Sequence, residues 1–139
     1  MLNRISHTGV WVSDQDQALA FYRDVLGFEV RMDVTVAEFG NMRWLEIGLP
    51  GQDVKLVLSA VTGSFLDAGT SDQLMAIMAK GYNPPVILEV EDCRATIEAL
   101  RAKGVEISQE PTDQFYGVDA GIRDPSGNSL RVTQPAPAA

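Results

Sequence analysis

Hydrophobic and polar residues recur along the first quarter of the chain with two different periods. Residues Ile5 to Val12 alternate at the period of a β-strand and include several β-branched side chains. After the polar segment "SDQDQ", apolar side chains return at helical spacing, at Ala18, Phe21, Tyr22 and Val25. The pattern therefore predicts a strand followed by an amphipathic helix.

Signals that begin and end this helix are also present in the sequence. Ser13 or Asp14 is placed to cap the first turn, and Gly27 stands where a helix commonly ends. Three further strands are then predicted, at Phe28 to Asp33, in "MRWLEIGLPG" and in "DVKLVLSA", and the turn "LPGQD" separates the last two. The first half of the chain thus predicts a strand, a helix and three strands.

The second half of the chain repeats this order. The segment "PPVILEV" predicts a strand, and "ED" then caps a helix with Cys93, Ile97 and Leu100 on one face. Gly104 ends that helix, and "VEISQE", "GVDAGIRD" and "NSLRVT" predict three more strands. The turn "DPSGN" between the last two has proline and glycine where turn chemistry favours them.

The two halves superimpose with a constant offset in their first strand and helix. Asp14 falls on Asp92 and His7 falls on Pro85, an offset of 78 residues in both cases (92 − 14 = 78). We expect one α+β domain with module one at about 3–60 and module two at about 84–134. A linker helix is expected at about 64–82, where "SDQLMAIMAKG" has a helical pattern from Ser71 that Gly81 closes.

Composition and charge limit the classes of function. The chain has 139 residues and a net charge of −8, which argues against binding to nucleic acid or to anionic membranes. No apolar run is long enough for a membrane span, and the first residues lack a signal-peptide core, so a cytoplasmic protein is expected. The single Cys93 fits a reducing compartment, and its register with Ile97 and Leu100 favours burial.

The duplicated order and two sequence segments resemble the vicinal oxygen chelate superfamily. The segments are "HTGVWVSDQDQALAFYRDVLGFEV" in module one and "GIRDPSGNSLRV" in module two, and the resemblance covers about positions 5 to 134. The superfamily includes glyoxalase I, extradiol dioxygenases, fosfomycin-resistance enzymes and bleomycin-resistance proteins. The resemblance implies that the eight strands form a U-shaped cup with the helices outside. It also implies a homodimer, since members are commonly dimers.

Metal-dependent members of the superfamily carry His, Glu or Gln ligands at four strand positions. In this chain those positions hold His7, Val57, Pro85 and Arg131. Val57 and Pro85 have no side-chain donor atom, and the cationic Arg131 repels a divalent ion. One imidazole does not hold a metal ion, because functional sites use about three or more protein ligands. We therefore expect no metal cofactor. His7 would be a metal ligand only if a metal ion were bound.

Strand alternation places a mixed set of side chains on the inner face of the expected cup. Aromatic walls with a few polar groups are typical of a small-molecule pocket. Planar ligands could stack on Trp44 or Tyr116, and Arg131 could pair with a ligand carboxylate. The candidate ligand-binding residues are His7, Trp44, Glu46, Val57, Ile87, Glu89, Tyr116 and Arg131.

A structural role is the alternative for several of these residues. His7 could be a hydrogen-bonded structural histidine, and Trp11 and Trp44 could belong to a core or a dimer interface. Arg131 could pair with an acid on a neighbouring strand instead of binding an anion. The acids considered are Glu46, Glu89 and Asp119.

Three functions remain open at this point. The missing metal ligands favour a metal-free protein similar to the bleomycin-resistance branch, which sequesters an aromatic or cationic antibiotic without catalysis. The alternative is a metal-dependent glyoxalase-type lyase or extradiol dioxygenase with an atypical ligand set and one divalent metal. A scaffold protein whose cup is filled by its own side chains is the third. No nucleophile–base pair is evident, so we assign no catalytic residue.

Overall fold

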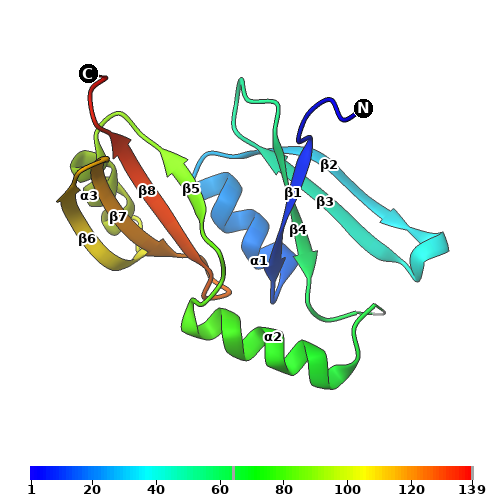
Figure 1. Ribbon diagram of the computed structural model, residues 1–139. Coiled ribbons are helices and arrows are strands. Elements are labelled where there is room, and N and C mark those ends of the chain that lie inside the picture. The colour runs from blue at the N-terminus through cyan, green and yellow to red at the C-terminus, as the bar shows by residue number, and fades with distance from the viewer. Residues whose placement is uncertain (64, 139) are drawn as a thin grey trace. The chain divides into compact units, whose positions relative to one another are not determined.

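Two four-stranded sheets organise the chain, as the ribbon diagram shows (Figure 1). The structure is a computed structural model, and it describes residues 1–63 and 65–138. The fold divides into two compact units, one of residues 1–75 and one that starts at Ala76. Each unit contains one sheet, and each is described by itself.

The described part of module one contains four strands, one helix that changes from α to π geometry, and one 3-10 turn. Strand β1 (His7–Val12) is followed by α1 (Gln15–Leu19), which continues as the π-helical segment Ala20–Val25. Strand β2 then leads through a 3-10 turn into β3 and β4, and the sheet order is β1-β4-β3-β2, with β1 parallel to β4. Their bounds are β2 Glu29–Val36, the 3-10 turn Ala37–Phe39, β3 Met42–Gly48 and β4 Lys55–Ala60.

Module two repeats the same topology. Its sheet order is β5-β8-β7-β6, with β5 parallel to β8 and the other pairs antiparallel. The helix α2 (Ala68–Lys80) joins the modules, and the boundary between the two compact units falls within it. The elements are β5 Val86–Glu89, α3 Cys93–Ala102, β6 Glu106–Gln114, β7 Gly117–Arg123 and β8 Ser129–Pro135. The prediction of an α+β fold with two tandem βαβββ modules is confirmed.

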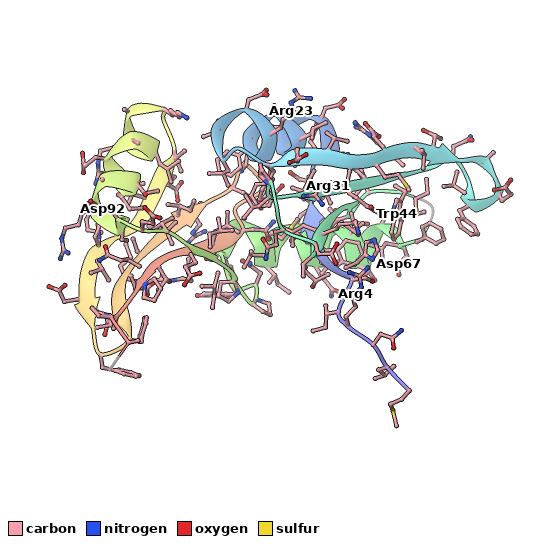
Figure 2. All side chains as sticks on the ribbon, turned by 90° about the horizontal axis from the view of Figure 1, so that it is seen from above. Arg4, Arg23, Arg31, Trp44, Asp67 and Asp92 are labelled. Atoms are coloured by element: carbon pink, nitrogen blue, oxygen red, sulfur yellow. The ribbon has the colours of Figure 1, made fainter. Side chains whose placement is uncertain are left out.

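One face of each sheet supplies the apolar core of its module. In module one, alternate strand residues such as Val12, Leu45, Ile47 and Leu58 are fully buried, together with Tyr22 of the helical segment. Alternation sends the intervening residues to the opposite face. Figure 2 shows Trp44 on one side of these strands and the helical segment that carries Arg23 on the other. The face with Trp44 is called the inner face below.

The predicted helix caps are present in both modules. The Asp14 carboxylate accepts a hydrogen bond from the Gln17 backbone N–H at 2.9 Å, and Asp92 does the same for Ala95 at 3.0 Å. Each cap satisfies an N–H that the first helical turn leaves without a partner. Gly27 has a φ of +85°, so it adopts the left-handed conformation predicted for the end of the helix.

The first helix differs from the prediction in its last turns. The Leu26 N–H donates to the carbonyl of Phe21, five residues back, so the helix widens after Leu19. Ala18, Phe21 and Tyr22 are buried as predicted, and the rings of Phe21 and Tyr22 meet edge to face at 5.3 Å. Phe28 packs in the core, and β2 begins one residue later than predicted.

The linker helix begins at Ala68 and not at Ser71 as predicted. Asp67 caps it, because its carboxylate accepts from both the N–H and the hydroxyl of Thr70 at 2.8 Å. Ser71 is buried within the helix, where its hydroxyl donates to the Val61 carbonyl at 2.5 Å. Ser71, which was predicted to begin the helix, therefore links the helix to the preceding loop by a hydrogen bond.

Three strands extend beyond their predicted ends because their partners continue to pair with them. Strand β2 pairs with β3 as far as Val36 and Met42, and β6 pairs with β7 as far as Gln114 and Gly117. Strand β8 continues to Pro135, which pairs with Gly117. Strand ends depend on the neighbouring strand, which local propensity does not report.

None of the helices in the described part of the chain has both the length and the apolar character needed to cross a membrane. The longest of them, α2, has 13 residues, which is shorter than the roughly 20 residues that a bilayer requires.

The single Cys93 provides a test of the module-two core. Its side chain is 0% exposed, and burial raises the pKa of the thiol, so little thiolate is available for reaction. We expect labelling by a thiol reagent to be slower in the native protein than in denaturant, on the order of a hundredfold or more. The measurement is the absorbance time course of the labelling reaction in buffer and in guanidinium chloride. Equal rates in the two solvents would contradict the buried position.

Candidate ligand-binding site

Three of the predicted site residues form one hydrogen-bonded network on the inner face of module one. Glu46 is only 6% exposed, and its Oε1 accepts from the indole N–H of Trp44 at 2.8 Å. The same oxygen lies 3.0 Å from His7 Nε2, and His7 Nδ1 lies 2.7 Å from the hydroxyl of Ser6. Since a carboxylate only accepts, Nε2 carries the hydrogen and Nδ1 accepts from Ser6. His7 therefore has the structural hydrogen bonds that were considered as its alternative role.

The electrostatics of Glu46 follow from these contacts. The hydrogen bond from Trp44 lowers the pKa of the Glu46 carboxyl, against the opposing effect of burial. The hydrogen bond from His7 and the positive charge of Lys55 act in the same direction as the hydrogen bond from Trp44. A buried carboxylate that keeps its charge requires such donors, so Trp44 and His7 are part of what makes the burial of Glu46 possible.

The side chains at the superfamily's metal positions do not fit a divalent ion. Val57 and Pro85 provide no donor atom, Arg131 is cationic, and the Nε2 hydrogen of His7 is directed to Glu46. Within residues 1–63 and 65–138, no three side chains of histidine, cysteine, aspartate or glutamate are gathered so that they could hold a metal. No metal-dependent step is therefore derived for this site.

A pocket of about 340 Å³ opens in module one, beside this network. Both tryptophans of the chain, Trp11 and Trp44, line it. The remaining lining comes from the start of α1, from the β2–β3 connection and β3, and from β4 with the loop that follows it. These residues are Gln15, Gly40, Asn41, Met42, Arg43, Val57, Ser59, Ala60, Thr62, Gly63, Phe65 and Leu66. The arrangement suits a planar, largely apolar molecule.

Arg43 is the charged side chain of the pocket wall, and two carboxylates hold it. Its Nε and Nη2 donate to Asp33 at 2.9 Å each, and its Nη1 donates to Asp16 at 2.6 Å. The hydrogen bonds from Arg43 to Asp33 and Asp16 raise the pKa of the guanidinium, so it remains charged. One cation faces two anions here, which leaves this side of the pocket negative.

Two predicted site residues of module two, Arg131 and Tyr116, share one buried carboxylate, that of Asp119. Arg131 Nη2 donates to Asp119 at 2.5 Å, and Tyr116 donates to the same carboxylate at 2.8 Å. Burial alone would raise the pKa of Asp119, but the hydrogen bonds from Arg131, Tyr116 and Thr133 outweigh it and lower that pKa. The ion pair considered as the structural alternative for Arg131 is thus present, and it is formed with Asp119.

The other two candidates in module two, Ile87 and Glu89, are exposed on β5. Ile87 is 67% exposed and pairs along the backbone with Arg131, while Glu89 pairs with Thr133. The ligand-binding roles of Ile87, Glu89, Tyr116 and Arg131 stay predictions.

Several residues of the pocket give no clear signal in the amino-acid sequence. Gln15 was treated as part of a capping segment, and Arg43 and Phe65 gave no signal at all. Their place in the pocket depends on the path of the loops after β2 and β4. Hydrophobic periodicity does not predict the path of a loop. Trp44 and Val57, which strand alternation gave as candidates, both line the pocket.

Comparisons with known proteins agree with this fold. A model of the Glyoxalase/Bleomycin resistance protein/Dioxygenase superfamily matches residues 4–132. The crystal structure of UcmS2 is 41% identical, with a TM-score of 0.89, over 96% of this chain and 98% of that one. TnmS3, an antibiotic binding protein from Streptomyces sp. CB03234, is 26% identical with a TM-score of 0.76, over 97% and 98% of the two chains. A probable lactoylglutathione lyase from Synechocystis sp. (strain ATCC 27184 / PCC 6803 / Kazusa) is 28% identical over 133 residues, 92% of each protein.

The network around Glu46 predicts a pH-dependent contribution to stability. Its folded pKa is lowered, so the stabilisation is present above the unfolded value, about 4.3 for glutamate, and is lost as the pH falls through the folded value. We expect Glu46→Gln to lower the free energy of unfolding by on the order of 1 kcal/mol at pH 7. The difference between the two proteins should shrink below about pH 4.

Urea denaturation of both proteins at a series of pH values measures this difference. Glu38→Gln is the matched control, because it removes an exposed carboxylate from the same module. A penalty for Glu46→Gln that stays constant from pH 7 to about pH 3 would contradict the charged state assigned to Glu46.

Proposed function

The chain belongs to the Glyoxalase/Bleomycin resistance protein/Dioxygenase superfamily, and from this premise we propose that it is a small-molecule-binding protein. In this proposal it sequesters an aromatic antibiotic in the module-one pocket, without a metal and without catalysis. The observation that carries the proposal is the pocket lined by both tryptophans of the chain.

The size and lining of the pocket support a ligand of drug-like dimensions. Small-molecule sites commonly have volumes of roughly 300–1,000 Å³ and mostly apolar walls with a few polar groups. The volume of about 340 Å³ lies at the lower end of this range and suits a ring system of a few fused rings. Trp11, Trp44 and Phe65 provide aromatic surface for stacking.

The orientation of Trp44 supports binding rather than a role in the core. Its ring lines the pocket, and its N–H is fixed by Glu46 at 2.8 Å. A side chain that is already held in place loses less conformational entropy when a ligand stacks on it. The His7–Glu46 pair therefore favours affinity without touching the ligand.

Charge favours a neutral or cationic ligand over an anionic one. The protein has a net charge of −8, and the Arg43 guanidinium at the pocket is matched by two carboxylates. Long-range attraction of a cationic drug by an acidic protein raises its association rate. A ligand carboxylate would have to compete with Asp33 and Asp16 for Arg43.

The comparisons give the proposal its antibiotic ligand class. TnmS3, which shares the fold over nearly its whole length, is an antibiotic binding protein. The probable lactoylglutathione lyase supports the enzymatic alternative at a similar identity. The side chains at the metal positions disfavour that alternative, because three of the four cannot coordinate a divalent ion.

Tryptophan fluorescence tests the proposal directly, because both tryptophans line the pocket. Doxorubicin and bleomycin are suitable probes, since both are cationic antibiotics with planar aromatic groups. We expect saturable quenching of the tryptophan emission, and we expect Trp44→Ala to weaken binding about tenfold, the loss of one stacking contact. Tyr82→Ala is the control, because Tyr82 is exposed and lies outside the pocket. Absence of saturable quenching and of any calorimetric signal with such probes would contradict the proposal.

Metal content separates the proposal from the enzymatic alternative. The protein is purified without added metal, measured by mass spectrometry, and titrated with the same probes in the presence and absence of a chelator. We expect no stoichiometric divalent ion and the same affinity in both titrations. A bound ion in stoichiometric amount, with affinity lost on chelation, would favour a metal-dependent lyase or dioxygenase.

A further inference from the structure

Strands β3 and β4 separate at the pocket, and a glutamine side chain lies between them. The two strands pair at Glu46–Val57 and Ile47–Leu56 only, although both continue further toward the pocket. Beyond these pairs, the Gln15 amide donates to the carbonyl oxygen of Arg43 at 3.1 Å and to that of Leu58 at 2.9 Å. One side-chain NH₂ group therefore joins two strands where their own ladder has ended.

Module two provides an internal comparison at the same position of the fold. The offset that aligns Asp14 with Asp92 also aligns Gln15 with Cys93. The thiol of Cys93 lies 3.4 Å from the carbonyl of Val132, and Val132 is the β8 counterpart of Leu58 in the parallel pairing with the first strand of its module. Strands β7 and β8 pair without interruption from Gly117–Pro135 to Arg123–Ser129. The longer side chain, Gln15, thus occurs in the module whose strands β3 and β4 separate. The shorter one, Cys93, occurs in the module whose strands β7 and β8 pair continuously.

The hydrogen bonds fix which way the Gln15 amide faces. Both Nε2 hydrogens point to backbone carbonyl oxygens, so the reversed amide would place Oε1 against two other acceptors. Asp14 caps the turn that carries Gln15 and holds its backbone. Oε1 accepts no hydrogen bond from the described residues, and Gln15 lines the pocket.

Three other polar side chains of the pocket wall, those of Trp44, Arg43 and Ser59, do not impose the same preference. The Trp44 N–H is engaged by Glu46, and the nitrogens of Arg43 by Asp33 and Asp16. The Ser59 hydroxyl can rotate, so it serves donors and acceptors alike. Gln15 alone among these presents a fixed acceptor.

We propose that Gln15 determines the specificity of the module-one pocket: its Oε1 accepts a hydrogen bond from the ligand, so the pocket selects planar aromatic molecules with an O–H or N–H donor at one edge. This inference rests on the proposed binding function and adds the ligand chemistry to it. A methylated donor loses the hydrogen bond, and the bound ligand then covers Oε1 of Gln15 without giving it a partner.

A pair of probes that differ only in the donor tests the inference. Calorimetric or NMR titrations with 2-naphthol and 2-methoxynaphthalene give the ratio of their dissociation constants. We expect the wild-type protein to prefer 2-naphthol about fivefold, the factor for one net hydrogen bond. We expect Gln15→Met, which keeps the length of the side chain, to reduce the ratio to about one.

Two further variants complete the experiment. Gln17→Met is the matched control, because Gln17 is an exposed residue of the same helix outside the pocket. The ratio of the two dissociation constants for this variant should equal that of the wild type. If Gln15→Met does not fold, Gln15→Cys replaces it, since Cys93 shows that cysteine is compatible with this position of the fold. The same loss of preference is expected for Gln15→Cys.

The outcomes distinguish this inference from the proposed function. Equal binding of the two probes by the wild type, or an unchanged preference in a folded Gln15 variant, overturns the role of Gln15 and leaves the binding function intact. If neither the naphthalenes nor the antibiotic probes bind, both the role of Gln15 and the proposed binding function are overturned.

Discussion

A carboxylate that is removed from water must find hydrogen-bond donors, and this requirement organises the inner face of module one. Glu46 is buried between β2 and β4 in the sheet, and it obtains its donors from Trp44 and His7. The Trp44 ring is consequently held with its N–H toward Glu46 while the ring lines the pocket. The position of an aromatic wall is thus set by the solvation of a charge, and the contact with Ser6 extends the network to the start of β1.

The duplication of the chain allows the two modules to share a topology and to differ in the pairing of their third and fourth strands. Both have the same strand order, the same parallel pair and an aspartate cap on the first helix. Module two has a continuous ladder between β7 and β8, and its buried Asp119 is matched by Arg131. Module one gives up part of the corresponding ladder, and the Gln15 amide supplies hydrogen bonds to the two strands instead. A pocket in a sheet needs such a substitute, because buried backbone groups left without partners are costly.

Features encoded locally were predictable from the sequence, and features that depend on distant partners were not. Asp14, Asp92 and Gly27 act through the backbone within a few residues, so their roles could be read directly. Alternation also placed Trp44 and Glu46 on one face of β3. The cap at Asp67 was missed because Ser71 offered an equally good local signal, and only the loop before the helix decides between them. Gln15 was missed because the carbonyls that it bonds lie 28 and 43 residues away in the sequence, and Arg43 because its carboxylate partners lie 10 and 27 residues away.

His7 illustrates how one residue can identify a fold and still have a different task. It occupies the first metal-ligand position of the superfamily, yet its Nε2 hydrogen is directed to Glu46 and its Nδ1 accepts from Ser6. An imidazole nitrogen that carries a hydrogen has no lone pair to offer a metal. To bind an ion through Nε2, His7 would have to change tautomer and release Glu46. Glu46 would then keep one donor, Trp44, so the cost of metal binding would fall on the same carboxylate that fixes the pocket wall.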